Sequence, residues 1–297
     1  MMLSREEAEE VLSQLKFKRR LSEEDLIVAI AQDWASGEVL MQAYMNREAA
    51  LQTLSTGRAT YWSTSRRQLW VKGETSGAFQ ELRGFRIDCD GDAVVLLVEP
   101  KGPSCHTGLH SCFDTYERFD IEGMKRRLVQ SIKKRALVFG DFTLTSGKKS
   151  TYYLDVKKLI TNPPDLALIS LLIAHRFGEG VDVVAGPELG AVPIVVSVAS
   201  RLRLPFVMLR RGERTHGTGR RIEGQLSKGQ KILLIDDVAT SGGSLVGSVQ
   251  AIQDEGAQVA VVTCVVDRQE GAREKLEEKY GLELSPLVTA DELGLKP

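Results

Sequence analysis

Residues 231–244 read KILLIDDVATSGGS, an apolar segment followed by two acids and a run of small residues. This order predicts a buried strand, a short loop and the start of a helix. Strands that are apolar on both faces are typical of a parallel sheet covered by helices on each side. Helical stretches at 165–177 and 243–255 alternate with three similar strands: VDVVA (181–185), PFVML (205–209) and QVAVVTCVV (258–266). The second half is therefore predicted to be an α/β domain with a Rossmann-like parallel sheet.

The first half of the chain has shorter segments, in which apolar and polar residues alternate. Six of them are predicted as strands of a mostly antiparallel sheet: LIVAI (26–30), VLMQAY (39–44), ATYWS (59–63), LWVKG (69–73), ELRGFRI (81–87) and AVVLLV (93–98). Asn46 is placed to cap a helix that Gly57 ends. Ser4 and Glu7 have the spacing of a capping box ahead of another helix. This half is predicted to be an α+β domain with an N-terminal helical extension.

The change of pattern falls in ERFDIEGMKRR, residues 117–127. This charged stretch holds no long Gly, Ser or Pro tract, so the linker is expected to be short and to run into a helix that ends near Leu137. We predict one domain at 1–118 and another at 124–297. The length of 297 residues agrees with two domains at about 150 residues each.

Composition excludes several classes of protein. Lys and Arg number 39 against 40 Asp and Glu, a balance that gives no electrostatic attraction to nucleic acid or to an anionic membrane. No apolar run approaches the roughly 18 residues of a membrane span, and the N-terminus lacks the apolar core of a signal peptide. Four cysteines are too few for a disulfide scaffold. We expect a cytoplasmic protein.

The small residues after the two acids form a candidate phosphate site. Backbone N–H groups at a helix N-terminus bind anions, and here five residues supply them: Thr240, Ser241, Gly242, Gly243 and Ser244. Asp236 and Asp237 are placed to accept hydrogen bonds from two ribose hydroxyls. The loop is neither a Walker A motif nor a GxGxxG turn. An ordinary strand-to-helix connection is the alternative, and the paired acids disfavour it.

A cationic, glycine-punctuated segment follows the strand at 205–209. It contains Arg210, Arg211, Arg214, His216, Arg220 and Arg221. Such a segment suits a lid that closes over a leaving diphosphate. A solvated basic loop, or a patch for an anionic partner, is the alternative.

These motifs resemble the type I phosphoribosyltransferases, and their surroundings resemble orotate phosphoribosyltransferase from about Leu128 to Glu270. The matching stretches are RALVFGDFTLTSGKKSTYYLD, AGPELGAVPI, RRGERTHGTGRRIEG and VVDRQEG. The resemblance implies transfer of phosphoribosyl from phosphoribosyl diphosphate to orotate, giving orotidine monophosphate. It implies that Thr240 and Arg268 hold the orotate ring and its carboxylate, a role for which a guanidinium is suited. It also implies at least a homodimer, because the lid reaches into the partner's site. We expect catalytic roles for Arg214, His216, Asp236 and Asp237, with substrate contacts from Arg210 and Arg211.

Three of the four cysteines, Cys89, Cys105 and Cys112, lie close together in the first half. Their spacing does not match the Cys-x2-Cys pairs of structural zinc fingers. Three thiolates without a fourth ligand suggest an open tetrahedral zinc site whose bound water ionises near neutral pH. Buried core thiols are the alternative. Cys264 lies in an apolar strand and is expected to be a core residue.

Asp88, Asp90 and Asp92 alternate around Cys89. On an extended segment, alternate residues face the same side, so the three carboxylates are expected to converge. Converging carboxylates repel one another unless a hard cation such as Mg²⁺ neutralises them. A polar turn is the alternative for this triplet.

Residues 25–115 resemble the phosphoribosyl-AMP cyclohydrolases of histidine biosynthesis. The matching motifs, in the family's order, are GEVLMQAYMNREAALQTLSTGRATYWSTSR, LWVKGETSG, DCDGD and CHTGLHSCF. The resemblance implies Zn²⁺ on the three cysteines, with Cys89 supplied across a dimer interface, and Mg²⁺ on the three aspartates. It also implies that water opens the purine of phosphoribosyl-AMP between N1 and C6. His106 is assigned to proton transfer; His110 is the alternative, and orienting a zinc ligand is open for both.

Several positions depart from the two families' patterns. Ala78 stands where His or Asn is usual, Thr64 where Arg is frequent, and Arg211 and Arg214 where the lid carries Lys. Candidate contacts to the phosphate or the ring of the cyclohydrolase substrate are Arg66, Lys72 and Ser76.

Two alternatives stay open for the second half: transfer to another nucleobase, or a regulatory module that senses phosphoribosyl diphosphate. Arg268 favours an anionic base. We find no helix-turn-helix pattern that would couple a sensor to DNA.

Overall fold

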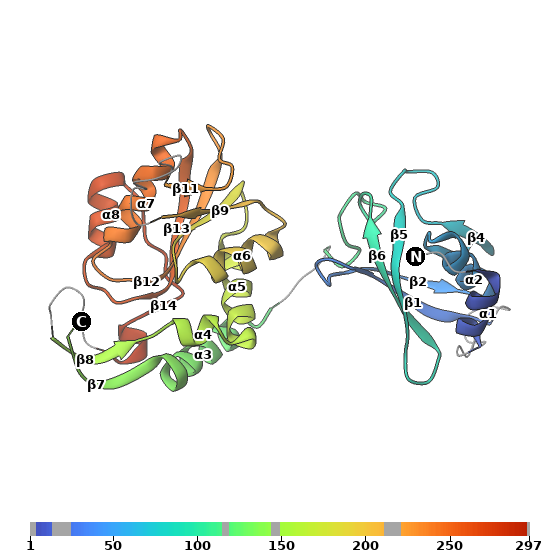
Figure 1. The fold of residues 1–297 in the computed structure, drawn as a ribbon, viewed down its shortest axis with the longest axis horizontal. Coiled ribbons are helices and arrows are strands. Elements are labelled where there is room, and N and C mark those ends of the chain that lie inside the picture. The colour runs from blue at the N-terminus through green and yellow to red at the C-terminus, as the bar shows by residue number, and fades with distance from the viewer. Residues whose placement is uncertain (1–3, 14–24, 115–118, 144–148, 211–220, 296–297) are drawn as a thin grey trace. The chain divides into compact units, whose positions relative to one another are not determined.

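A computed structural model of the chain describes residues 4–13, 25–114, 119–143, 149–210 and 221–295. The chain divides into two compact units, Met1–Phe119 and Asp120–Pro297 (Figure 1). Each unit buries its own apolar core. Among the described residues, no helix combines the length and the apolar character needed to cross a membrane.

The described strands of the first unit form a six-stranded sheet in the order β4-β3-β2-β1-β6-β5. The strands are β1 (Ile27–Asp33), β2 (Val39–Met45), β3 (Thr60–Ser63), β4 (Gln68–Val71), β5 (Gln80–Ile87) and β6 (Ala93–Pro100). Only the pairing of β1 with β6 is parallel within these residues; the other neighbours are antiparallel. The prediction of an α+β unit with a mostly antiparallel sheet is confirmed.

Helix α2 (Arg47–Thr56) is bounded by the two residues that the sequence indicates. Asn46 Oδ1 accepts a hydrogen bond from the Ala49 N–H at 2.9 Å, which satisfies a free donor of the first turn. Gly57 ends the helix with φ at +70°, and its N–H donates to the Thr53 carbonyl. The helix buries Leu51 and Leu54 in the core of the unit.

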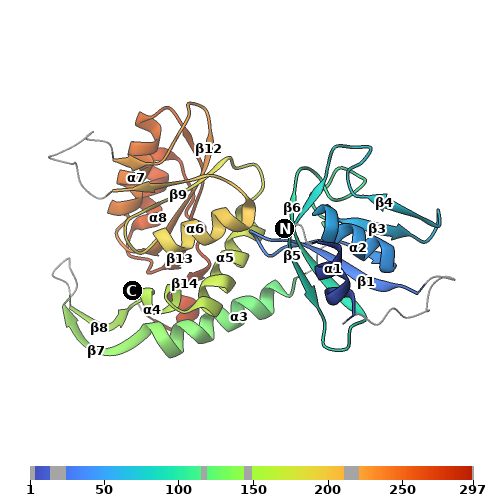
Figure 2. The same cartoon turned by 45° about the vertical axis from the view of Figure 1, so that its right-hand side comes forward.

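Helix α1 (Arg5–Leu12) starts at the predicted capping box. The Ser4 N–H donates to Glu7 Oε2 at 2.8 Å, and the Glu7 N–H donates to Ser4 Oγ at 3.3 Å. Ala8 and Leu12 are buried in the same core as α2. The two helices lie side by side on the sheet (Figures 1 and 2), so the N-terminal extension packs on the body of the first unit.

The main sheet of the second unit has the described strand order β11-β10-β9-β12-β13-β14. Its strands are β9 (Val183–Pro187), β10 (Phe206–Leu209), β11 (Ile222–Glu223), β12 (Lys231–Ala239), β13 (Gln258–Asp267) and β14 (Val288–Thr289). Neighbours are parallel except for the short β10–β11 pair. The helices next to it are α5 (Pro163–Phe177), α6 (Val192–Leu202), α7 (Gly243–Asp254) and α8 (Ala272–Tyr280). The predicted α/β architecture is confirmed.

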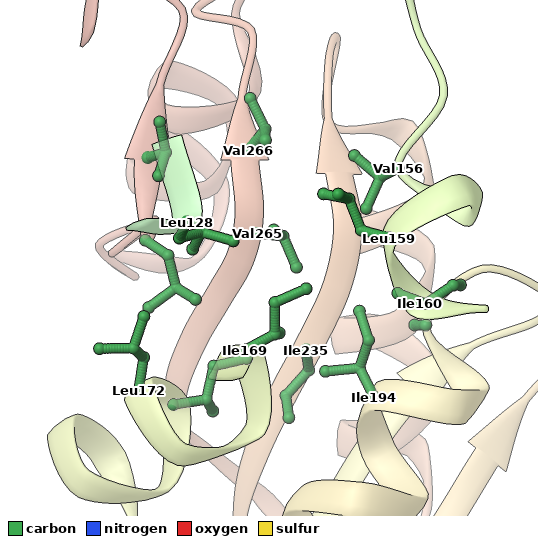
Figure 3. Close-up of a cluster of buried hydrophobic side chains, with 14 of the residues drawn as sticks. Leu128, Val156, Leu159, Ile160, Ile169, Leu172, Ile194, Ile235, Val265 and Val266 are labelled. Carbon is green, nitrogen blue, oxygen red and sulfur yellow. The ribbon is translucent and has the colours of Figure 1, made fainter. Parts of the chain in front are cut away.

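Strand β12 contributes to two separate cores because its side chains alternate between the faces of the sheet. Leu233 and Ile235 belong to the core formed with α5 and α6, part of which Figure 3 shows. Ile232 and Leu234 belong to the core formed with α7 and α8, which also contains Cys264. The prediction that Cys264 is a core residue is confirmed. Residues 232–235 of the strand are all apolar because both faces of the sheet are covered there.

A helix and a hairpin precede the main sheet. Helix α3 (Ile121–Ser131) continues as the π-helical turn η1 (Ile132–Ala136), so the predicted helix does end near Leu137. The chain then forms a two-stranded ribbon of β7 (Leu137–Thr143) and β8 (Lys149–Leu154), which the sequence analysis does not predict. Helix α4 (Lys157–Ile160) follows, and a 3-10 turn η2 (Asp291–Leu293) lies near the C-terminus.

The buried carboxylate of Asp165 ties α5 to α3 and η1. Asp165 is 3% exposed; Ser131 Oγ donates to its Oδ1 at 2.8 Å, and Arg135 Nε lies 3.2 Å from its Oδ2. Replacing Asp165 with alanine is expected to lower the free energy of unfolding of the second unit by about 2 kcal/mol. Asp165→Asn keeps the acceptor for Ser131 and is expected to lose about half of that.

The two units offer separate signals for this measurement. All three tryptophans, Trp34, Trp62 and Trp70, lie in the first unit. Tryptophan fluorescence therefore follows the first unit, whereas far-UV circular dichroism follows both. In urea, we expect an earlier dichroism transition for Asp165→Ala with an unchanged fluorescence transition. If both transitions of Asp165→Ala occur at the wild-type urea concentrations, the stabilising role of Asp165 is contradicted.

Candidate functional sites

The two predicted acids of the second unit lie at the carboxyl edge of its sheet. Asp236 is 3% exposed and pairs in register with Cys264 of β13, and Asp237 follows it. Ala239, the last residue of β12, pairs with Asp267. Ligands of open α/β sheets bind beyond this edge of the strands. Residues that follow β12 and β13 are thus brought to one site.

The loop after β12 has the geometry of an anion site. Gly242 has φ at +76° and precedes α7, and a Cβ there would lie 2.9 Å from the Ala272 Cα, so a side chain has no room. Ser244 Oγ is buried, with no hydrogen-bond partner among the described residues. The first N–H groups of a helix also lack intrahelical partners. Together these donors point to a ligand rather than to an ordinary connection.

Two segments from elsewhere in the chain contact this loop and the acid that precedes it. Lys275 Nζ, from α8, donates to the Ser241 carbonyl at 2.8 Å. The segment between β9 and α6 approaches Asp237 closely, since a Cβ on Gly190 would lie 1.9 Å from Asp237 Oδ2. No local sequence pattern indicates either contact, because each joins residues that are distant in the chain.

Arg268 is a buried cation at the same edge. It directly follows β13, its N–H donates to the Ala239 carbonyl at 2.9 Å, and it is 6% exposed. Arg268 Nε lies 2.8 Å from Glu270 Oε1, in an ion pair whose angle is not that of a hydrogen bond. The guanidinium carbon lies 4.8 Å from the ring centre of Tyr152, on β8. A buried guanidinium at this edge has the chemistry to bind a carboxylate.

Two of the predicted lid residues are described. The Arg210 guanidinium pairs with Glu223 at 2.9 Å, next to the paired strands β10 and β11. The Arg221 guanidinium lies 3.3 Å from the position of a Cβ on Gly247, and so beside the first half of α7. The other predicted lid residues, Arg211, Arg214, His216 and Arg220, lie outside the described residues.

In the first unit, the aspartate triplet converges, although by a different geometry from the one predicted. The segment is the turn between β5 and β6 rather than an extended strand, so the reason given from strand alternation is wrong. Gly91 has φ at +78°, and Asp88 Oδ1 accepts from the N–H groups of Gly91 and Ala93. One carboxylate oxygen from each aspartate lies within 4.8 Å of the other two. The turn thus presents three acids to one point, as a hard cation requires.

Two of the three candidate zinc ligands are neighbours within one chain. Cys105 is buried and Cys112 half-buried; hydrogen bonding by Thr107, whose Oγ1 lies 3.0 Å from Cys105 Sγ, lowers the pKa of the Cys105 thiol. Burial raises the pKa of the Cys112 thiol, and the adjacent Cys105 adds to this rise. Cys89 is exposed, and the described residues hold no cluster that joins it to the other two.

A buried network holds the loop that carries these thiols. Tyr61 Oη donates to Gln80 Oε1 at 2.8 Å, and Gln80 Nε2 donates to Ser104 Oγ at 3.1 Å. Burial raises the pKa of Tyr61, which keeps its hydroxyl a donor. Sequence analysis misses this network. A Gln on a buried strand position is the signal that marks it, because a buried amide needs partners.

The basic side chains of this site lie at different depths. His106 is exposed, with Nδ1 4.0 Å from Cys105 Sγ, and His110 Nε2 lies 3.7 Å from the Glu38 carboxylate. Lys72 is buried and donates to the Pro103 carbonyl at 3.3 Å. Burial lowers the pKa of Lys72, and the two neighbouring cysteines, Cys112 and then Cys105, oppose that change. Lys72 is thus a buried cation whose charge interacts with both thiols.

The remaining candidate positions are more peripheral. Thr64, Arg66 and Ser76 are exposed in turns. Ala78 is 8% exposed and packs against Gly102, where an added Cβ would lie 3.1 Å away. Its departure from the family pattern therefore falls in a tightly packed turn.

Comparison with known families agrees with the division into two units. The phosphoribosyl-AMP cyclohydrolase family matches residues 41–114, and the phosphoribosyl transferase domain family matches residues 156–291. The chain is similar to the orotate phosphoribosyltransferase of Pyrococcus furiosus, with 47% identity over 174 residues, 57% of this chain and 95% of the relative. It has 48% identity over 162 residues to that of Methanopyrus kandleri, covering 54% of this chain and 87% of the relative.

Solved structures give the same result for the fold. The orotate phosphoribosyltransferase of Aeropyrum pernix matches with a TM-score of 0.52 and 32% identity, over 56% of this chain and 95% of that one. That of Mycobacterium tuberculosis in complex with inorganic phosphate matches with a TM-score of 0.50 and 30% identity, over 58% and 99%. The predicted type I phosphoribosyltransferase fold is confirmed. Through its second unit the chain belongs to the orotate phosphoribosyltransferase family, and its first unit contains a phosphoribosyl-AMP cyclohydrolase domain.

Proposed function

We propose that the chain is a bifunctional enzyme. The second unit transfers phosphoribosyl from phosphoribosyl diphosphate to orotate, in pyrimidine biosynthesis. The first unit opens the purine ring of phosphoribosyl-AMP between N1 and C6, in histidine biosynthesis. The observation that carries the transferase proposal is the meeting of paired acids, an anion loop and a buried arginine at one sheet edge.

Each part of that edge matches one part of the transferase substrates. The N–H groups of residues 240–244 and the buried Ser244 hydroxyl bind the ribose phosphate. Asp236 and Asp237 accept hydrogen bonds from the ribose hydroxyls. Thr240 and Arg268 hold the ring and the carboxylate of orotate. The complex of a relative with inorganic phosphate supports an anion site on this fold.

The lid supplies positive charge to the leaving diphosphate. Arg210 and Arg221, at the two ends of residues 211–220, mark where this loop leaves and rejoins the sheet. We assign Arg211, Arg214 and His216 to the developing negative charge on the diphosphate, from the sequence pattern. Arginine at 211 and 214 binds diphosphate through a planar fork rather than a compact ammonium.

An assay of the purified full chain tests the transferase. Orotate and phosphoribosyl diphosphate are expected to yield orotidine monophosphate and diphosphate. Turnover with purines alone, from a panel of nucleobases, supports the alternative of another base. Binding of phosphoribosyl diphosphate without turnover of any base supports a sensor.

The thiols and acids of the first unit fit the two metals that the cyclohydrolase family implies. Cys105 and Cys112 are adjacent soft ligands, and Cys89 of a second copy of the chain completes the proposed set for zinc. When bound, zinc supplies a hydroxide at neutral pH. The converging oxygens of Asp88, Asp90 and Asp92 suit magnesium.

The chain's own groups place the substrate and move the proton in this unit. His106, beside Cys105 and exposed to the site, is the proposed proton carrier. Its neighbour His110 faces Glu38 and is better placed to orient the loop. Conversion of phosphoribosyl-AMP by the purified chain tests this activity, and its absence from zinc-loaded protein contradicts the proposal.

A homodimer and a cytoplasmic location complete the proposal. None of the four cysteines, all of which the structure describes, forms a disulfide, and this supports a reducing compartment. Both proposed sites need a second copy, through Cys89 in one unit and the lid in the other. Light scattering on the full chain is expected to give a dimer or a larger closed assembly. A monomer at assay concentration contradicts shared sites.

Gly190 offers a test of the transferase geometry. Replacing it with alanine places a Cβ 1.9 Å from Asp237 Oδ2, so either the loop or the carboxylate must move. We expect kcat/KM for phosphoribosyl diphosphate to fall about 10- to 100-fold. The cyclohydrolase activity of the same sample is the control and is expected to stay unchanged. Wild-type transferase kinetics in Gly190→Ala contradict a role for Asp237 in its observed position.

A further inference from the structure

The Arg268 guanidinium is held on more than one side. Its charged carbon lies 4.8 Å from the centre of the Tyr152 ring, and its Nε lies 2.8 Å from Glu270 Oε1. Tyr152 is 5% exposed and Arg268 is 6% exposed, so this contact is shielded from water. Cation–π attraction is stronger where the cation is desolvated. The ring therefore contributes more here than at a surface.

Tyr152 reaches Arg268 from a separate part of the unit. It belongs to β8 of the two-stranded ribbon, whereas Arg268 follows β13 of the main sheet. Backbone pairing of Tyr152 with Phe139 of β7 fixes the ring's place in the ribbon. The ribbon thus contributes one of the contacts to the Arg268 guanidinium, from outside the motif at residues 240–244.

The two contacts restrict the conformations open to the Arg268 side chain. The guanidinium carbon lies over the face of the Tyr152 ring, and the Glu270 carboxylate lies beside Nε. A bidentate carboxylate binds in the guanidinium plane through parallel N–H donors. A free arginine side chain loses rotamer entropy when it binds a ligand, whereas a side chain that is already fixed has little left to lose.

We propose that Tyr152 is a positioning residue that holds Arg268 ready for the substrate carboxylate, and so favours orotate over bases that lack a carboxylate. This inference rests on the proposed transferase function. Tyr152 acts through Arg268 and does not take part in bond making or breaking. Its effect is therefore on the KM for orotate, with little effect on kcat or on the KM for phosphoribosyl diphosphate.

The first experiment compares Tyr152→Leu with Tyr152→Phe in the full chain. Leucine fills apolar space without a ring face, and we expect the KM for orotate to rise about tenfold, which corresponds to ~1.4 kcal/mol. Phenylalanine keeps the ring and is expected to restore the wild-type KM. Uracil, which lacks the carboxylate, is expected to be used equally poorly by wild type and Tyr152→Leu. An unchanged KM for orotate in Tyr152→Leu overturns the proposal.

A double-mutant cycle separates positioning from general damage. If Tyr152 acts through Arg268, Tyr152→Leu adds no further loss in a chain that already carries Arg268→Met. Additive losses, or a matching rise in the KM for phosphoribosyl diphosphate, overturn the proposal. Wild-type protein that turns over no orotate overturns the transferase function itself, so the two failures are distinct.

A shape-conserving series covers the case in which Tyr152→Leu does not fold. Phenylalanines with increasing ring fluorination, introduced at position 152, keep the ring's outline while removing the negative charge from its face. We expect the KM for orotate to rise stepwise with fluorination. A KM that is flat across the series shows that the ring only fills space, and overturns the proposal.

Discussion

Replacing Arg268 with methionine is expected to lower kcat/KM for orotate by about a hundredfold or more, a loss of ~3 kcal/mol. Arg268 is 6% exposed, and its guanidinium lies 2.8 Å from the Glu270 carboxylate. Methionine keeps much of the apolar stem but removes the charge. The carboxylate of orotate then approaches Glu270 without the intervening cation, so like-charge repulsion adds to the lost hydrogen bonds.

Steady-state kinetics with each substrate varied in turn measures this loss. The KM for phosphoribosyl diphosphate is expected to stay unchanged, because the anion loop and the two acids are intact. Arg273→Met is the matched control: its side chain is 49% exposed and lies 3.9 Å from Asp267, outside the proposed ring contacts. We expect it to keep wild-type kinetics. Wild-type kcat/KM for orotate in Arg268→Met contradicts the assignment of the carboxylate site.

The fold follows from local patterns wherever a single segment carries the signal. Asn46 and Gly57 bound α2 because a cap depends only on residues of its own helix turn. The apolar run of β12 predicts a doubly covered strand, and its residues do divide between two cores. The β7–β8 ribbon escapes prediction because it lies outside the main sheet and exposes apolar residues, Phe139 among them at 72%. The pattern of β7 therefore does not mark a buried face, although β8 buries Tyr152 and Leu154.

The candidate sites were predictable in residue type more than in geometry. Sequence order places Asp236, Asp237 and the small residues at one sheet edge, because a strand and its following loop are continuous. The aspartate triplet shows the limit, since its carboxylates converge through a turn with a positive-φ Gly91 rather than through strand alternation. Contacts such as Gly190 with Asp237 and Tyr152 with Arg268 join distant segments. No local pattern encodes them, so only the folded chain reveals which residues support the predicted ones.

Replacing Cys105 with alanine is expected to remove zinc and the cyclohydrolase activity together. Elemental analysis is expected to find about one zinc per wild-type chain and almost none in the variant. Loss of a residue that merely orients a ligand costs 10- to 100-fold, so we expect the loss of a ligand to exceed about a hundredfold. Cys264→Ala is the matched control, because Cys264 is buried in the other unit's core. Zinc-free protein with full activity contradicts the proposed mechanism.

Mixing variants tests where the third thiolate comes from. Cys89 is exposed and, within one chain, is not clustered with Cys105 and Cys112 among the described residues. Cys89→Ala and Cys105→Ala are each expected to be inactive alone. In a mixed dimer, one site combines the intact Cys105 and Cys112 of one copy with the intact Cys89 of the other, so activity and zinc return together. If all three ligands came from one chain, each copy would carry its own defect and mixing would restore neither activity nor zinc.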